Sequence, residues 1–478
     1  MNSMTMLHDE QKPERGYGPA FLLILVMLVG AGLVYYFVLR EDDVTKADLT
    51  PDATANYDVE INLYNGDLDV SAEIEVLNDS IDSWEEIGFD FVSSGLHDQG
   101  ISIFLGSSLE TRLNSVTDSE GDLFYKLSNN RFLIQLKEPL EPGEKKKISV
   151  VYTLRIQDYD GRHLGFEDDL FFSDWYPKIA QYDNGWVIPE LKVYEETGYP
   201  TYSDFSIRYK LDDPRLVISS AVDGEIKESS SGTLEAKQIK DFSISFLKPV
   251  NWTSTPIDVN DTEMRFFWPA DGKLDQTAAY GATNAFDFYE ENIGDHPSQE
   301  MDLLATSEVG SRTNVLGMGE ADLNGEIPVE SIAAFLAYQW FGQNLLTNPS
   351  TDAWVSVSLS DYIASAYMTE NYEDEDQAFQ SASEYVKRVE PAKYANTPSD
   401  EWDEWSYGVT LYGKTPLLLR EFFNDKGGEE AAFRFLSAFL KKYQFQHVNS
   451  QTFASFLDDY FEGDQSEWLE TWLKLDEK

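Results

Sequence analysis

Cysteine is absent from this chain of 478 residues, so disulfide bonds and thiolate metal ligands are excluded. Histidine is scarce, and no two of the five histidines lie within five residues of each other. Imidazole pairs one helical turn apart, which zinc peptidases use, are therefore missing, and so is the G-x-S-x-G pattern of many serine hydrolases. The histidines are His8, His97, His163, His296 and His447. The common motifs for hydrolysis are thus not present.

Basic residues are also few, with 36 lysines and arginines against 86 aspartates and glutamates, a formal net charge of −50. The acidic residues are spread along the chain. A negative field of this size repels nucleic acid and anionic lipid, so nucleic-acid partners are excluded. The composition is typical of a solvated acidic surface in a saline or alkaline exterior.

The amino-terminal region predicts a membrane anchor. Residues 20–39 are uncharged and almost wholly apolar, and 20 residues of helix span roughly 30 Å, the hydrocarbon thickness of a bilayer. A cleaved signal usually has a shorter apolar stretch, so an uncleaved signal anchor is favoured. Basic residues are balanced on its two sides. We expect residues 1–19 to form a cytoplasmic tail, 40–56 an acidic linker, and the rest to be extracytoplasmic on a single-pass protein of the cell membrane.

Residues 57–250 predict an antiparallel β domain. Apolar residues alternate over 59–63 and 68–76 on either side of Asn65-Gly66, which indicates a hairpin. The same period of two recurs over 148–156 and 242–246.

After residue 250 the pattern changes to a few strands and then helices. Pro328 and Glu330 suit the first turn of a helix that is expected to run to about Leu345. Residues 251–400 are taken as a second domain and 401–478 as carboxy-terminal helices. Further helices are expected at 377–388, 416–424, 428–442, 451–461 and 466–473.

Two segments of the second domain carry a resemblance. They are VESIAAFLAYQWFGQNLL at 329–346 and DAWVSVSLSDY at 352–362. They resemble the gluzincin signature of the membrane alanyl aminopeptidase family, H-E-x-x-H-x-W-F-G followed by a tryptophan and a glutamate ligand. Gln339-Trp340-Phe341-Gly342 and Trp354 are in register, and the step from position 338 to 357 is the family's 19 residues.

The resemblance extends to the β domain through WYP at 175–177, Gly185-Trp186 and YSDF at 202–205. It implies an α+β multidomain fold: an antiparallel β saddle, a thermolysin-like α/β domain and a short helical bundle.

The zinc-ligand positions themselves do not match. The first histidine falls on Ala334, the general-base glutamate on Phe335, the second histidine on Tyr338 and the third ligand on Val357. Alanine, phenylalanine and valine offer no lone pair, and a lone phenol is a poor ligand. We therefore expect no zinc and no other cofactor, although the family uses zinc.

Two other family elements survive in part. Tyr412 with Lys414 resembles the segment whose tyrosine stabilises the oxyanion, so Tyr412 is a candidate remnant of the catalytic site; the alternative is a structural tyrosine. Glu320, in LGMGEAD at 316–322, resembles the glutamate that binds the substrate amine; the alternative is a solvated carboxylate. Glu320, Tyr338 and Tyr412 are therefore candidate ligand-binding residues.

These features favour a membrane-anchored pseudoenzyme of the aminopeptidase family, which binds a peptide or an envelope protein or serves as a scaffold. The alternative is an active zinc aminopeptidase with a displaced metal site. A third hypothesis is an envelope structural protein whose groove is closed by Phe335 and its neighbours.

Overall fold

A computed structural model describes residues 51–64, 66–95, 110–155, 164–166, 169–191, 201–306, 309–318, 329–372, 375–388 and 393–475. The expected membrane helix at 20–39 lies outside these residues. Within them no helix is both long and apolar enough to cross a membrane. Thr50–Lys478 forms one compact unit.

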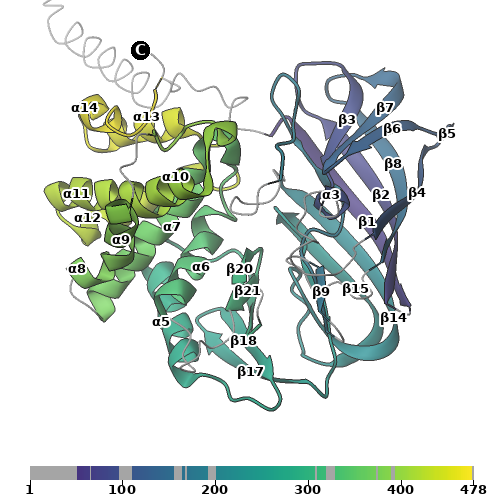
Figure 1. The fold of residues 1–478 in the computed structure, drawn as a ribbon, viewed down its shortest axis with the longest axis horizontal. Coiled ribbons are helices and arrows are strands. Elements are labelled where there is room, and N and C mark those ends of the chain that lie inside the picture. Colours follow the sequence, from purple (N-terminus) through teal and green to yellow (C-terminus); the bar gives the residue numbers. More distant parts are fainter. Residues whose placement is uncertain are drawn as a thin grey trace, which may run out of the picture. The chain divides into compact units, whose positions relative to one another are not determined.

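The first half of the compact unit is built on a ten-stranded sheet (Figure 1). The strand order is β5-β4-β8-β2-β1-β14-β16-β10-β9, and β15 also pairs with β14. The strands are β1 Ala53–Tyr64, β2 Asp67–Asn78, β4 Glu110–Asp118, β5 Gly121–Asp122, β8 Lys145–Arg155, β9 Leu164–Phe166, β10 Asp169–Phe172, β14 Ser203–Ser219, β15 Glu228–Ile239 and β16 Ile244–Leu247.

The expected hairpin is present as β1 and β2, joined at Gly66, whose positive φ of 81° suits glycine in a tight turn. Buried and exposed residues alternate along β1, as the period of two predicted. The strand begins at Ala53, before the expected start of folded structure at Tyr57. The expectation of a purely antiparallel sheet fails at one place, because β1 pairs with β14 in parallel.

A smaller sheet, in the order β11-β3-β7-β6, shares its hydrophobic core with the large one. Phe91 contacts Tyr152 of β8 with ring centroids 5.0 Å apart. The WYP segment lies in this core, since Trp175 Nε1 donates to the Phe242 carbonyl at 2.9 Å. The elements are β3 Trp84–Asp90, α3 Val92–Gly95, β6 Phe124–Ser128, β7 Arg131–Leu140, β11 Lys178–Ile179, and the separate pair β12 Gln181–Tyr182 and β13 Trp186–Val187.

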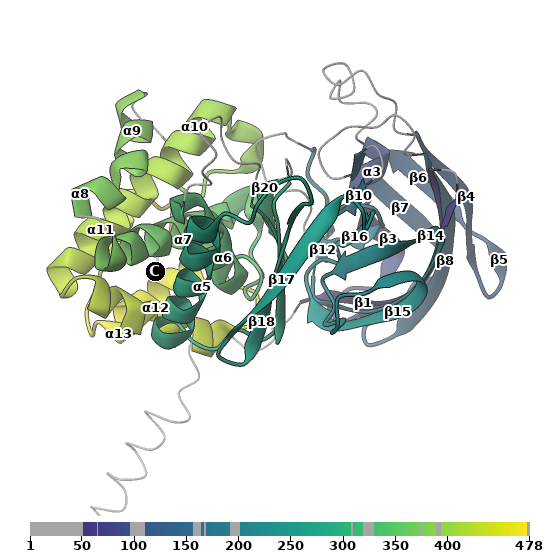
Figure 2. The ribbon, with the colours of Figure 1, turned by 90° about the horizontal axis from the view of Figure 1, so that it is seen from below.

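The second half begins with a mixed sheet in the order β17-β18-β19-β21-β20. Helices α5 and α6 lie beside it (Figure 2). The elements are β17 Trp252–Val259, β18 Thr262–Pro269, α5 Gln276–Asn292, β19 Glu300–Leu304, β20 Val309–Arg312, β21 Val315–Met318, α6 Val329–Phe341 and α7 Pro349–Asn371.

Helix α6 ends at Phe341 and not near Leu345 as expected. Polar side chains bond to carbonyls at this end: Asn344 Nδ2 donates to the Gln339 carbonyl of the last turn at 2.9 Å, and Lys240 Nζ donates to the carbonyl of Gly342, just past the helix, at 2.6 Å. Polar side chains thus replace the next turn of helix.

The carboxy-terminal part is helical, as expected. The helix expected over 466–473 is shorter, because α14 ends at Leu469. The elements are α8 Glu375–Ala378, α9 Gln380–Arg388, the 3-10 turn η2 Ser399–Glu401, α10 Glu404–Gly408, the π-helix η3 Val409–Lys414, α11 Thr415–Lys426, α12 Glu429–Tyr443, α13 Ser450–Tyr460 and α14 Ser466–Leu469. The multidomain α+β class with a helical carboxy-terminal part is confirmed.

Candidate functional site

Helices α6 and α7 carry the four positions that the sequence resemblance aligns with a zinc site. The helices pack against each other and are joined by a short connection, residues 342–348, so they are antiparallel neighbours (Figure 1). Ala334, Phe335 and Tyr338 on α6 are half-buried, whereas Val357 on α7 is 5% exposed. The three side chains on α6 therefore remain partly accessible to solvent.

The donor set at these positions does not fit zinc. Three of the four side chains have no lone pair to offer. The fourth, Tyr338, lies with its ring over Gly342, where a side chain on residue 342 would have no room. Across the described ranges there is also no group of three or more histidine, cysteine, aspartate or glutamate side chains placed to hold a metal ion.

The two histidines that the structure describes, His296 and His447, each contact a side chain of the fold. His296 is 8% exposed and contacts the Trp340 ring, with centroids 5.2 Å apart. Burial lowers the pKa of His296 to about 4, so its imidazole is neutral near pH 7. His447 Nε2 lies 3.3 Å from Gln181 Oε1, and burial lowers its pKa too.

Three residues that match the family signature, Gln339, Trp340 and Trp354, anchor α6 and α7 by hydrogen bonds. Gln339 is fully buried and forms three side-chain hydrogen bonds to the β20–β21 hairpin. Trp340 Nε1 donates to the Gly294 carbonyl at 2.7 Å. Trp354 Nε1 donates to Ser450 Oγ at 2.9 Å. These hydrogen bonds join different parts of the chain to each other. The three residues therefore have a role in the fold that does not depend on a metal.

The Tyr412 segment lies beside α7. Tyr412 is in the π-helix η3, and the preceding carbonyl, of Leu411, accepts a hydrogen bond from Ser358 Oγ at 2.7 Å. Ser358 directly follows Val357, so the structure brings η3 next to the third ligand position. The half-buried Tyr412 ring is stacked on Tyr385 of α9, with centroids 6.0 Å apart.

Glu320 lies outside the described residues. Sequence reasoning missed a different carboxylate, Asp361, which is one helical turn beyond Val357 on α7. Burial raises the pKa of Asp361 to about 8, and the negative charge of Glu330 adds to the effect. Glu330 is one turn before Ala334 on α6, so both carboxylates are displaced by one turn from positions that the resemblance aligns with zinc ligands. The four-residue spacing was the signal available in the sequence.

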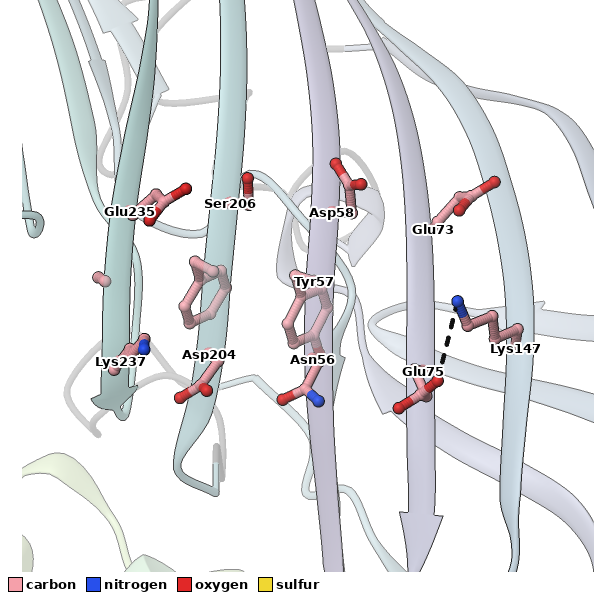
Figure 3. Close-up of a pocket in the computed structure, with 12 residues that line it drawn as sticks. Asn56, Tyr57, Asp58, Glu73, Glu75, Lys147, Asp204, Ser206, Glu235 and Lys237 are labelled. Carbon is pink, nitrogen blue, oxygen red and sulfur yellow. Dashed lines mark ion pairs between the residues drawn. The ribbon is translucent and has the colours of Figure 1, made fainter.

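A separate hollow of about 350 Å³ lies on the ten-stranded sheet (Figure 3). No residue of α6 or α7 lines it. Its charged side chains project from adjacent strands, and several are paired: Asp58 with Arg208 at 2.7 Å, and Glu75 with Lys145 at 2.8 Å. Such cross-strand pairs stabilise a sheet.

The fold is similar to that of known metallopeptidases. The M1 zinc metallopeptidase from Deinococcus radiodurans matches with a TM-score of 0.62 and 13% identity, over 89% of this chain and 96% of that one. A mutant of that enzyme bound to a Tyr-Ser-Ala substrate matches with a TM-score of 0.61 and 12% identity, over 89% and 95%. Yeast LTA4 hydrolase in complex with bestatin matches with a TM-score of 0.61 and 11% identity, over 89% and 69%.

The chain therefore has the fold of the M1 zinc metallopeptidases, in which zinc is expected. It is aminopeptidase-like in architecture. No protein-family model and no curated protein matches the sequence. At this level of identity the likeness concerns the fold and not the activity.

Proposed function

We propose that this protein is a non-catalytic relative of the M1 peptidases that binds a peptide or an envelope protein at the outward face of α6. The observation that carries the proposal is the donor chemistry of Ala334, Phe335, Tyr338 and Val357 on an otherwise anchored helix pair. Without zinc or a general base at these positions, the site has no group to activate water. It keeps the backbone framework that would position a ligand.

A binding role is favoured over a closed structural core. Ala334, Phe335 and Tyr338 are half-buried, so each keeps part of its surface accessible to solvent. Aromatic side chains at such a surface are common anchors for peptide ligands. The Deinococcus enzyme, in a mutant form, was bound to a Tyr-Ser-Ala substrate, so a short peptide is a suitable first ligand.

The experiment measures Tyr-Ser-Ala binding by calorimetry, with metal analysis of the same sample. We expect binding without hydrolysis. Phe335→Ala should weaken binding about tenfold, because a buried aromatic contact contributes more than 1 kcal/mol. The matched control is Phe124→Ala on β6, where the ring is 83% exposed, and it should change affinity less than twofold.

The alternative, an active enzyme with a displaced metal site, predicts a different result. Bound zinc at one per chain, with cleavage of aminoacyl amides that a chelator abolishes, would establish it and remove the pseudoenzyme proposal. Equal affinity in Phe335→Ala and Phe124→Ala would place any binding elsewhere.

We also propose that residues 20–39 anchor the protein in the cell membrane with the large domain extracytoplasmic. The support is the length and apolarity of that segment. Protease added to intact cells should digest residues 57–478 if this orientation is right. Protection of the domain in intact cells, with digestion after lysis, would reverse it.

A further inference from the structure

A buried arginine lies where the first half of the compact unit meets the second. Arg265 on β18 is 1% exposed. Its guanidinium forms a two-pronged ion pair with Asp302 of β19, Nε to Oδ1 and Nη2 to Oδ2, both at 2.6 Å. Glu300, also on β19, lies 2.9 Å from Nη2. Arg265 is therefore held by two carboxylates of its own sheet.

The same arginine binds the loop between β14 and β15 of the large sheet. Arg265 Nη1 donates to Asp223 Oδ1 and to the Gly224 carbonyl, both at 2.7 Å. In return, Glu300 accepts from the Asp223 and Gly224 backbone amides at 3.1 and 2.9 Å. These contacts tie the loop to the five-stranded sheet.

The cluster has one positive group for three carboxylates. Within the described residues, Arg265 is the sole basic side chain that pairs with Asp223, Glu300 and Asp302. Burying two uncompensated negative charges costs several kcal/mol per ion. Asp223 and Glu300 both lie on the same guanidinium, at 2.7 Å from Nη1 and 2.9 Å from Nη2, so their two negative charges are close together. Neighbouring carboxylates repel each other, and a proton on one of them removes that repulsion.

Other titratable groups near the cluster add no positive charge to it. Glu263 precedes Arg265 by two residues and so lies on the same side of β18. Asp258 of β17 pairs with Glu263 in register and is exposed. Further along the β14–β15 loop, Glu225 and Lys227 are exposed to solvent. A bound proton is therefore the available means of reducing the charge.

We propose that Arg265, Asp223, Glu300 and Asp302 form a proton-dependent latch, which holds the β14–β15 loop on the five-stranded sheet while one carboxyl is protonated and releases it as the pH rises. The latch is independent of ligand binding at α6. Its protons belong to the cluster as a whole, because the three carboxyl groups interact strongly.

The direction of the pH effect follows from the raised pKa values. Burial raises the pKa of Asp302 to about 7, against the opposing effect of Arg265, and also raises those of Asp223 and Glu300. Release of the loop would take Asp223 away from the cluster and return its carboxyl group to its ordinary pKa of 3.8. Between these values the closed latch binds more protons than the open one. Opening should thus become more favourable by about tenfold per pH unit from pH 5 to about pH 7, roughly a hundredfold in all.

The test is hydrogen exchange of residues 220–227 in the full chain at pH 5 and pH 8, expressed as protection factors so that the intrinsic pH dependence of exchange cancels. Protection in the wild type should fall roughly a hundredfold. In Asp223→Asn the side chain carries no negative charge at any pH, while its oxygen still accepts from Arg265. Protection in this variant should change less than tenfold.

The control is Asp241→Asn. Asp241 accepts a hydrogen bond from the Thr313 amide at 3.1 Å, another contact between the two halves of the compact unit, but it does not touch Arg265. This variant should keep the wild-type fall in protection at 220–227. Unchanged wild-type protection between pH 5 and pH 8 would overturn the proposal, and so would an equal fall in Asp223→Asn and the wild type.

Discussion

The anchoring role of Gln339 leads to a quantitative prediction. Its side chain is fully buried and forms hydrogen bonds to Ser311 Oγ at 2.5 Å, to the Arg312 carbonyl at 2.8 Å and from the Asn314 amide at 3.1 Å. Each bond contributes about 1 kcal/mol net, and partners left unsatisfied in the interior cost about 1–3 kcal/mol. Gln339→Ala should therefore lower the free energy of unfolding by about 3–5 kcal/mol.

The measurement is denaturant unfolding followed by tryptophan fluorescence. Gln343→Ala is the matched control, since the buried Gln343 side chain forms a single hydrogen bond, with Thr313 Oγ1 at 2.9 Å, and should cost about 1 kcal/mol. A loss below 1 kcal/mol for Gln339→Ala would refute the reasoning. It would mean that the hydrogen bonds of Gln339 to the β20–β21 hairpin are not needed for the fold.

Two further predictions concern α6 and α7. Placing the family's ligands and base at all four aligned positions should allow the protein to take up zinc, because the helix spacing is kept. Zinc uptake is measured by metal analysis after dialysis. Absence of zinc would count against the alignment of these positions with the family's site. The substitutions are Ala334→His, Phe335→Glu, Tyr338→His and Val357→Glu. Asp361→Asn should leave stability unchanged near pH 3 and raise the melting temperature by roughly 5–10 °C near pH 9. The reason is that a carboxyl with its pKa raised from 3.8 to about 8 contributes stability that is lost as the pH rises through this range. Equal melting temperatures at pH 9 would refute it.

Local patterns predicted much of the fold. The β1–β2 hairpin follows from strict alternation around a turn sequence, and α11 to α13 follow from their apolar period. Spacing and aromatic residues located α6 and α7 through Trp340 and Trp354. These features depend on residues close together in the sequence, which is why a single sequence was enough.

Other features depend on distant segments and could not be predicted. The parallel pairing of β1 with β14 joins strands about 150 residues apart, with Val59 opposite Ile207. The Arg265 latch combines β18, β19 and a loop of the large sheet. Alternation and helical period are unchanged by these pairings, so the sequence pattern contains no sign of them.

The π-helix η3 has a consequence for insertions and deletions. Its hydrogen bonds join residues five apart, as from the Thr415 amide to the Thr410 carbonyl, so it accommodates one residue more than an α-helix would. Removal of one residue would convert the segment to α-helix and rotate one side of it by about 100° relative to α11. Tyr412 would then leave its stacked position on Tyr385. An aligned tyrosine in a relative without this extra residue would thus project in another direction, although the letters of the two sequences agree.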